Sequence, residues 1–225
     1  MTLAEKKLCK KYNTNRMSPF DAVALRSILD TFGRKNLRCL EIGSWFGTGS
    51  TQIIGEYSDH LVCVDHWQGN DNAAHREITK TFDVYQDFFA NTAHFGDVIV
   101  PIRGDSSIVC PLLAPESFDF IFIDGDHKYI PTVVDIKNCR KLLKRGGILA
   151  GHDCEGRVTE MNKDVIHANS EKDHIPSVFS NFVDCHPGVI RAVDEEIDNA
   201  ILFAERELFI EGARGSSTIW CVEIT

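Results

Sequence analysis

The sequence lacks the features that mark several common classes of protein. It has no CxxC pair, no apolar run near the ~20 residues that a membrane helix needs, and no internal repeat or low-complexity segment. Basic residues are outnumbered: 24 lysines and arginines stand against 33 aspartates and glutamates, a formal net charge of −9. Such a charge repels nucleic acid phosphates. We therefore expect a small-molecule substrate, no nucleic acid partner and no membrane association.

Length and cysteine usage narrow the class further. A chain of 225 residues, 43% of them hydrophobic, is long enough for one well-buried domain and short for two, so we expect a single domain over 1–225. The opening sequence MTLAEKKLCKKYN lacks the apolar core of a signal peptide. Several of the eight cysteines lie in apolar runs, and we interpret the cysteines as reduced thiols of the core or surface. These features predict a cytoplasmic protein.

Continuous apolar segments recur along the chain, separated by segments with helical periodicity. Continuous rather than alternating apolar character is typical of strands that are covered on both faces. Alternation of strand and helix predicts an α/β fold with a parallel sheet and right-handed crossovers. The expected strands are 37–42, 60–64, 98–102, 118–123 and 147–150.

Helices are expected between these strands and before the first of them. Ser18 can cap a helix and Pro19 suits a first helical turn, so we expect a helix over 20–32 within an N-terminal helical segment, 1–35. The other expected helices are 50–57, one that places Ile78, Phe82, Tyr85 and Phe89 on a single face, and one through Val133, Ile136, Arg140 and Leu143.

Beyond Gly151 the regular alternation ends. Residues 152–174 are polar with little periodicity, which predicts a mobile lid or insertion loop. Helical spacing returns over 175–199, interrupted at His186-Pro187-Gly188, and antiparallel strands are expected at 200–209 and 217–224. The last strand could be buried by sheet pairing or by a second copy of the chain, so a homo-oligomer stays open.

A glycine-rich turn, in the sequence LEIGSWFGTGS, follows the first expected strand. Glycines at Gly43, Gly47 and Gly49 let the backbone approach a ligand, and the next helix offers free N–H groups. The dinucleotide fingerprint G-x-G-x-x-G requires glycine where this chain has Trp45. The turn therefore predicts a nucleotide-like ligand other than NAD.

Acidic residues follow three of the expected strands. Asp65 ends the second strand about 20 residues after the turn, where an acid binds ribose hydroxyls in nucleotide-binding sheets; a helix cap is the alternative. Asp124 and His127 follow strand four, and His152 and Asp153 follow strand five. Neighbouring strands are about 5 Å apart, so acids at both ends can share a divalent cation.

Taken together, the motifs resemble class I S-adenosylmethionine-dependent methyltransferases, in a branch similar to catechol O-methyltransferases and the sugar O-methyltransferases of macrolide biosynthesis. The resemblance covers roughly residues 36–155 and rests on LEIGSWFGTGS, VDHWQGN, RGDS, FDFIFIDGDH and LLKRGGILAGHD, with weaker matches in HPGVIRAVDE and STIWCVEI. It implies a doubly wound, mostly parallel seven-stranded Rossmann-like sheet with an antiparallel C-terminal strand and helices on both faces. It also implies S-adenosyl-L-methionine as cofactor and O-methylation as the reaction.

The resemblance also assigns residues to the cofactor. It implies that Glu41, Gly43 and Gly47 surround the methionine end and that Asp65 binds the ribose. Trp67 either walls the adenine pocket or packs in the core. The full predicted cofactor set is Glu41, Gly43, Ser44, Trp45, Gly47, Ser50, Asp65, His66, Trp67, Gly104, Asp105, Ser106 and Asp124.

Catalytic and metal-binding residues are implied at the acidic strand ends. Metal-dependent relatives use one Asp after strand four and an Asp-Asp or Asp-Asn pair after strand five. Asp124 and Asp153 match this pattern, but His152 stands first in the pair, which favours manganese, iron or zinc over Mg²⁺. Alternatively no metal binds, and His127 or His152 removes the substrate proton. The predicted metal ligands are Asp124, His152 and Asp153, and the predicted catalytic residues are these three and His127.

Other functions stay open at this point. An NAD-dependent dehydrogenase is disfavoured by Trp45, and a nucleic acid methyltransferase by the acidic charge. A scaffold protein that has lost activity is disfavoured by Asp65, Asp124 and Asp153, because a decayed site has no physical need for acids at three strand ends. The acceptor, whether sugar, phenol or another hydroxyl compound, is not specified.

Overall fold

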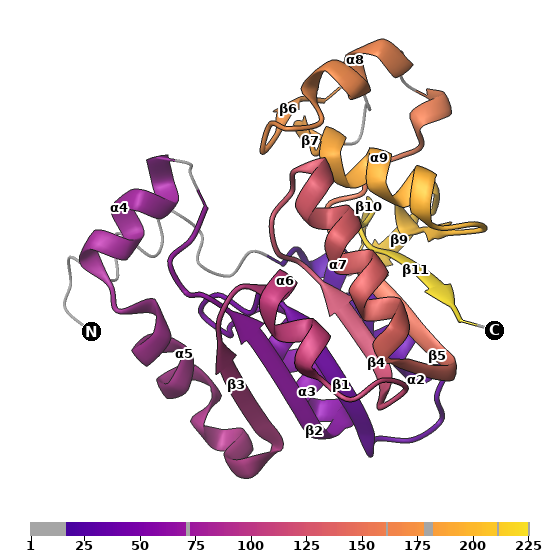
Figure 1. Cartoon of the computed structure of the whole chain (residues 1–225). Helices are drawn as coiled ribbons and strands as arrows, with labels where there is room; N and C mark the ends of the chain where they lie inside the picture. The colour runs from indigo at the N-terminus through magenta and orange to yellow at the C-terminus, as the bar shows by residue number, and fades with distance from the viewer. Residues whose placement is uncertain (1–16, 71–72, 161, 178–181, 211, 225) are drawn as a thin grey trace.

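A seven-stranded sheet forms the centre of the computed structural model, which describes residues 17–70, 73–160, 162–177, 182–210 and 212–224 (Figure 1). Five neighbouring strands are parallel, and the last strand in sequence runs antiparallel to both of its neighbours. This arrangement confirms the predicted doubly wound fold. In order across the sheet the strands are β3 (Ile99–Arg103), β2 (Ser58–Asp65), β1 (Leu37–Ile42), β4 (Phe118–Ile123), β5 (Leu143–Gly151), β11 (Trp220–Glu223) and β8 (Ile201–Leu202).

The direction of winding reverses between β1 and β4. From β1 the chain adds β2 and β3 on one side, and it then returns to place β4 and β5 on the other. In open α/β sheets, the crevice outside the carboxyl ends of the strands at such a reversal is where ligands bind. The glycine turn after β1 and the acids after β4 therefore meet at the favoured position.

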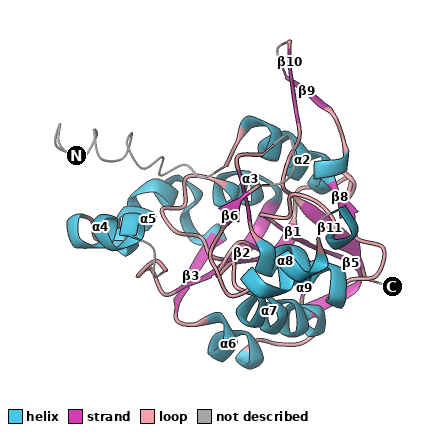
Figure 2. Cartoon of the chain, turned by 90° about the horizontal axis from the view of Figure 1, so that it is seen from above, coloured by secondary structure: helices cyan, strands magenta, loops and turns pink. Residues whose placement is uncertain are grey.

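Two layers of helices cover the sheet, because alternate side chains of each buried strand point to opposite faces. Leu40 and Ile42 of β1 belong to one apolar cluster, whereas Leu37 and Cys39 belong to the other. Figure 2 shows the two layers from above. On one face lie α2 (Pro19–Asp30), α3 (Ser50–Tyr57), α4 (Ala73–Thr81) and α5 (Val84–Thr92); on the other lie α6 (Ser106–Val109), α7 (Tyr129–Leu142), α8 (Lys163–Asn169) and α9 (Pro187–Glu196).

Several predicted elements match the structure to the residue. The strands 37–42 and 118–123 and the helix 50–57 have the predicted bounds. The helix that follows Ser18 begins at Pro19, and the Ser18 hydroxyl accepts a hydrogen bond from the Asp21 N–H, as a cap does. Of the predicted N-terminal helical segment, residues 1–16 lie outside the described part of the chain.

The single helical face predicted through Ile78 and Phe89 is wrong. The chain forms two helices there, because the Asp83 side chain accepts from the Gln86 N–H and starts α5 anew. Ile78 is fully buried, whereas Phe89 is 42% exposed. The capping residue Asp83 therefore ends the helical repeat of apolar residues and starts a new helix.

The second half of the chain also departs from prediction. The expected loop 152–174 contains η3 (Val158–Glu160) and α8, and α8 lies above the carboxyl edge of the sheet (Figure 1). The prediction of helix over 175–199 is wrong before Pro187, because β6 (Ile175–Pro176) and β7 (Asp184–Cys185) form a short antiparallel pair there. The segment 200–209 is divided between β8 and β9 (Leu208–Ile210); β8 pairs with β11 as expected, and β9 pairs with β10 (Ala213–Gly215).

Two expectations about the environment can be compared with the described residues. The seven cysteines in that part of the chain are buried and free of disulfides, as expected of reduced thiols. Among the helices described, none combines the length and apolar character required to cross a bilayer.

Asp119 ties together the end of the sheet opposite the carboxyl edge. Its carboxylate accepts from Lys144 Nζ at 2.8 Å, from the Arg38 N–H at 2.9 Å and from Arg34 Nη2 at 3.0 Å. Burial raises the pKa of Asp119, but the bonds from Lys144 and Arg38 outweigh burial, so the pKa lies below its usual value.

We expect Asp119→Asn to lower the free energy of unfolding by about 1 kcal/mol at pH 7. Because the folded-state pKa is lowered, this stabilisation is complete above the unfolded pKa of about 3.9 and is lost as the pH falls through the folded value. The free energy of unfolding of the wild type and of Asp119→Asn is measured in urea at several pH values between 7 and 3. Asp97→Asn, at an exposed position, is the control. A stability difference that persisted undiminished at low pH would contradict the assignment.

Candidate active site

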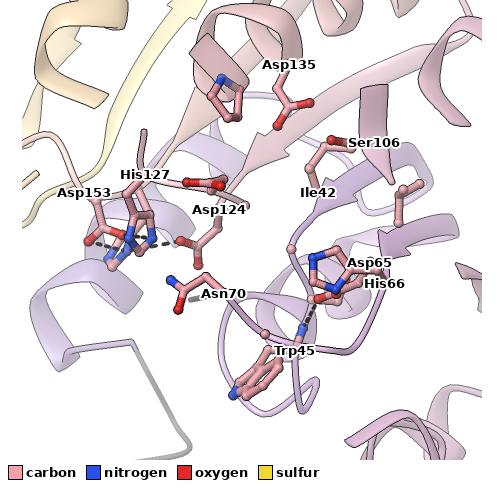
Figure 3. Close-up of a pocket in the computed structure, with 18 of the residues that line it drawn as sticks. Ile42, Trp45, Asp65, His66, Asn70, Ser106, Asp124, His127, Asp135 and Asp153 are labelled. Atoms are coloured by element: carbon pink, nitrogen blue, oxygen red, sulfur yellow. Dashed lines mark hydrogen bonds and ion pairs between the residues drawn. The ribbon is translucent and has the colours of Figure 1, made fainter. Parts of the chain in front are cut away.

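A cavity of about 540 Å³ opens at the carboxyl edge of the sheet, beyond the ends of β1, β2, β4 and β5. Asp65 and His66 lie toward one end, and Asp153 and His127 lie toward the other (Figure 3). Asp124, which follows β4, lies between the two ends. The cavity therefore joins the nucleotide-type residues of the sequence to the acidic and imidazole groups.

The glycine turn after β1 forms the floor of the cavity. Gly43 has φ +85°, in the region that favours glycine, and its N–H donates to the Val64 carbonyl at 2.9 Å. A Cβ at position 43 would overlap the backbone carbonyl oxygen of Asp124. The turn thus lies directly against the end of β4, which only glycine allows.

Glu41, on β1, holds this turn through hydrogen bonds to its side chains. Its fully buried carboxylate accepts from the hydroxyls of Ser44 at 2.7 Å, Ser50 at 2.5 Å and Thr51 at 2.6 Å. Burial raises the pKa of Glu41, and these hydroxyls oppose the effect. Glu41 is absent from the cavity lining, so within this structure it contributes to the site by holding the turn in place.

Asp65 fixes the turn from the side of β2. Its carboxylate accepts from the backbone N–H of Trp45 at 2.8 Å and of Trp67 at 2.6 Å, and it also lines the cavity. Burial raises the pKa of Asp65 against those bonds. Trp67 is only 3% exposed and packs on Tyr85 and Phe88, which matches core packing, the second of its two predicted roles.

The turn RGDS contributes a further wall. Asp105 accepts from the Ser107 N–H at 2.8 Å and caps α6, while Gly104, Asp105 and Ser106 all line the cavity. Asp135 of α7 lines the same part, on the side of Ser106 (Figure 3). Burial raises the pKa of Asp135 to about 7. The helical spacing of α7 gave no sign of this inward carboxyl group.

At the other end, His152 lies among three carboxylates. Its Nδ1 is 3.1 Å from Asp153 Oδ1 and 3.6 Å from Asp124 Oδ1, and its Nε2 is 3.2 Å from Asp21 Oδ2. Burial lowers the pKa of His152, but Asp153 and Asp124 raise it well above its usual value. Asp21 comes from α2 and was not expected at the site.

Asp153 is the centre of a second group of histidines. His127 Nε2 lies 3.1 Å from Asp153 Oδ2, and His127 Nδ1 lies 2.9 Å from Asp173 Oδ1. His186 Nδ1 lies 3.7 Å from Asp153 Oδ1 and 2.7 Å from Glu155 Oε1. Burial raises the pKa of Asp153, yet the surrounding histidines hold it well below its usual value.

The last strand supports the end of β5. Trp220 of β11 faces Gly151, where a Cβ would lie 2.6 Å from the indole ring. Just beyond, the Cys154 N–H donates to the Thr218 carbonyl at 2.9 Å, and the Asp153 N–H donates to the Thr218 hydroxyl at 3.2 Å. The strand is thus buried by sheet pairing, the first of the two predicted possibilities.

Two overlapping sets of residues can hold a divalent ion. One is the predicted set, Asp124, His152 and Asp153; the other is His127, Asp153 and His186. Within each set the donor atoms lie within 4.8 Å of one another. Each set mixes imidazole nitrogen with carboxylate oxygen, a donor combination that suits a transition metal and not the all-oxygen shell of Mg²⁺.

A family comparison decides the identity of the chain. The sequence model of the family described as a methyltransferase domain matches residues 40–154, just over half of the chain. The chain belongs to this methyltransferase family. The matched residues run from the glycine turn to the residue after Asp153, and so include most of the cavity.

Solved structures share the fold of this methyltransferase domain. An O-methyltransferase from Bacillus cereus, in complex with SAH (S-adenosylhomocysteine), is 18% identical with a TM-score of 0.56, over 100% of this chain and 92% of that one. The O-methyltransferase TomG from Streptomyces achromogenes, in complex with SAM (S-adenosylmethionine), is 14% identical with a TM-score of 0.59, over 100% and 91%. At such identities the likeness shows the fold. Curated proteins gave no match.

Most predicted site residues of the methyltransferase domain lie at the cavity, and three do not. Glu41, Gly47 and Trp67 are absent from its lining. His186, Asp135 and others line the cavity without having been predicted. The predicted residues at the cavity are Gly43, Ser44, Trp45, Ser50, Asp65, His66, Gly104, Asp105, Ser106, Asp124, His127, His152 and Asp153.

Proposed function

We propose that the protein transfers the methyl group of S-adenosylmethionine to a hydroxyl oxygen of a small molecule. The observation that carries the proposal is the cavity itself, which places a glycine turn and Asp65 at one end and the acid and histidine groups at the other. A net charge of −9 supports a small acceptor over nucleic acid. The buried thiols support a cytoplasmic location.

The nucleotide end has the groups that an adenosine cofactor needs. Asp65 presents a carboxylate that can accept hydrogen bonds from two ribose hydroxyls, and the turn at Gly43 permits close backbone approach. Asp105, Ser106 and Asp135 present polar groups for the edge of a purine. The SAH and SAM complexes of the two structural relatives support this assignment.

Methyl transfer needs little from the protein besides alignment and removal of a proton. The acceptor oxygen attacks the methyl carbon, the carbon–sulfur bond breaks with its electron pair going to sulfur, and the hydroxyl proton leaves for a base. Asp124 lies between the two ends of the cavity, where its carboxylate can orient the acceptor hydroxyl. His152 faces carboxylates through both ring nitrogens, which places it to relay the released proton.

A divalent metal is a further part of the proposal. Asp153 would hold it, because this residue belongs to both donor sets. When bound, such an ion supplies Lewis-acid polarisation of the acceptor oxygen.

We expect S-adenosylhomocysteine to bind in a calorimetric titration and NADH not to bind. Asp65→Ala should weaken S-adenosylhomocysteine about 10- to 100-fold, because two hydrogen bonds to a charged acceptor are lost. Exposed Asp97→Ala serves as the control and should change nothing. Tighter binding of NADH would end the methyltransferase proposal in favour of a dehydrogenase, and binding of neither would favour a scaffold.

A further inference from the structure

His127 has the surroundings of a metal ligand. Its Nδ1 lies 2.9 Å from Asp173 Oδ1, a carboxylate that can accept a hydrogen bond from this nitrogen. Nε2 is directed at Asp153, 3.1 Å away. A carboxylate on one imidazole nitrogen and a metal on the other is the arrangement that orients histidine ligands in metalloproteins.

His186 approaches Asp153 from another element, through its Nδ1. It precedes α9. The Glu155 carboxylate accepts a hydrogen bond from the His186 backbone N–H at 3.0 Å and lies 2.7 Å from His186 Nδ1. The rings of His127 and His186 lie 4.6 Å apart between centroids, at 69°. Two histidines from separate elements are therefore each fixed by a carboxylate beside the same Asp153.

The spacing suits a single ion. Ligands about 2.1 Å from a metal lie about 3.0 to 3.4 Å from one another in octahedral or tetrahedral geometry. Asp153 lies 3.1 Å from His127 Nε2 and 3.7 Å from His186 Nδ1. His186 Nδ1 would exchange its contact with Glu155 for the cation, while the His186 backbone N–H keeps its bond to Glu155. This small adjustment closes the set around one cation.

The predicted alternative, Asp124 with His152 and Asp153, is less accessible. The side chain of His152 is 9% exposed, against 20% for His127 and 17% for His186. His152 Nδ1 already lies between two carboxylates, with Asp21 on its other nitrogen.

We propose that His127, Asp153 and His186 form a binding site for one divalent transition metal, with Asp173 and Glu155 as positioning residues. Two imidazoles and one carboxylate leave coordination positions open toward the cavity, which all three ligands line. The binding of the ion stands on these residues alone. Its use in fixing an acceptor hydroxyl rests on the proposed methyl transfer.

The test is direct metal binding to the whole chain after chelator treatment. Zn²⁺ is titrated by calorimetry, and Co²⁺ by its visible absorption bands, each with and without millimolar Mg²⁺. We expect Zn²⁺ and Co²⁺ to bind at one site without competition from Mg²⁺. His186→Ala should weaken binding at least ~100-fold and Asp173→Asn about 10- to 100-fold. The surface variant His94→Ala and the variant Asp124→Asn should bind as the wild type does.

Parallel measurements separate the possible failures. Binding of S-adenosylhomocysteine by the same samples shows whether each variant is folded, and it tests the cofactor site independently of the metal. If His186→Ala does not fold, His127→Gln and Asp173→Asn carry the test. The proposal is overturned if the wild type binds neither Zn²⁺ nor Co²⁺. It is equally overturned if Asp124→Asn abolishes binding while His186→Ala retains it.

Discussion

Replacing Asp124 with alanine is expected to lower the rate of methyl transfer by about 10²- to 10⁴-fold, the usual contribution of a group that handles the substrate proton. Its carboxylate lies at the centre of the cavity, 3.6 Å from His152 Nδ1. The glycine turn and Asp65, which hold the nucleotide end, are left intact. Affinity for S-adenosylhomocysteine should therefore change less than about threefold.

The measurement is formation of S-adenosylhomocysteine with a panel of phenols and sugars, using the acceptor that the wild type turns over fastest. Asp124→Asn keeps the size of the side chain and removes its charge, so it should be nearly as inactive as the alanine variant. Asp97→Ala, at an exposed position, is the control. Normal turnover by the alanine variant would remove Asp124 from the mechanism.

Gly43→Ala is expected to lower the free energy of unfolding by about 2 to 5 kcal/mol. Two costs combine at this position. An alanine at φ +85° is strained, and its methyl group would overlap the carbonyl oxygen of Asp124, which the chain can relieve only by moving β1 away from β4. Since both strand ends line the cavity, affinity for S-adenosylhomocysteine should fall together with stability.

Gly33→Ala provides a matched control. Its φ is +61°, so the backbone strain is similar, but nothing lies within 4 Å of the added methyl group. We expect it to lose only about 1 to 2 kcal/mol in urea unfolding and to bind S-adenosylhomocysteine normally. Equal losses in the two variants would mean that contact with Asp124 contributes nothing.

Features that depend on neighbouring residues could be predicted from the sequence. The β1 and β4 strands are largely apolar runs, and the Ser18–Pro19 pair starts α2 by local hydrogen bonding. The carboxyl ends of parallel strands share one edge, so the order of strands and acids along the chain is enough to place Asp65 and Asp124 at the site.

Other parts of the site depend on contacts between distant segments, for which a single sequence has no signal. Asp21 reaches His152 from α2, and Asp173 reaches His127 from the segment expected to be a loop. His186 interrupts a helical pattern in the sequence, and only the fold brings it beside Asp153. For Trp67 the sequence left two roles open, and the fold buries the side chain in the core although Asp65, two positions earlier, lines the cavity.

The support that β11 gives to β5 sets an order of events during synthesis on the ribosome. Thr218 bonds the backbone at Asp153 and Cys154, and Trp220 covers Gly151. A nascent chain that has exposed the glycine turn and all five parallel strands still lacks these partners. The nucleotide end of the cavity can therefore form while translation continues, whereas the acidic end is completed only when residues 217–223 have emerged and inserted beside β5.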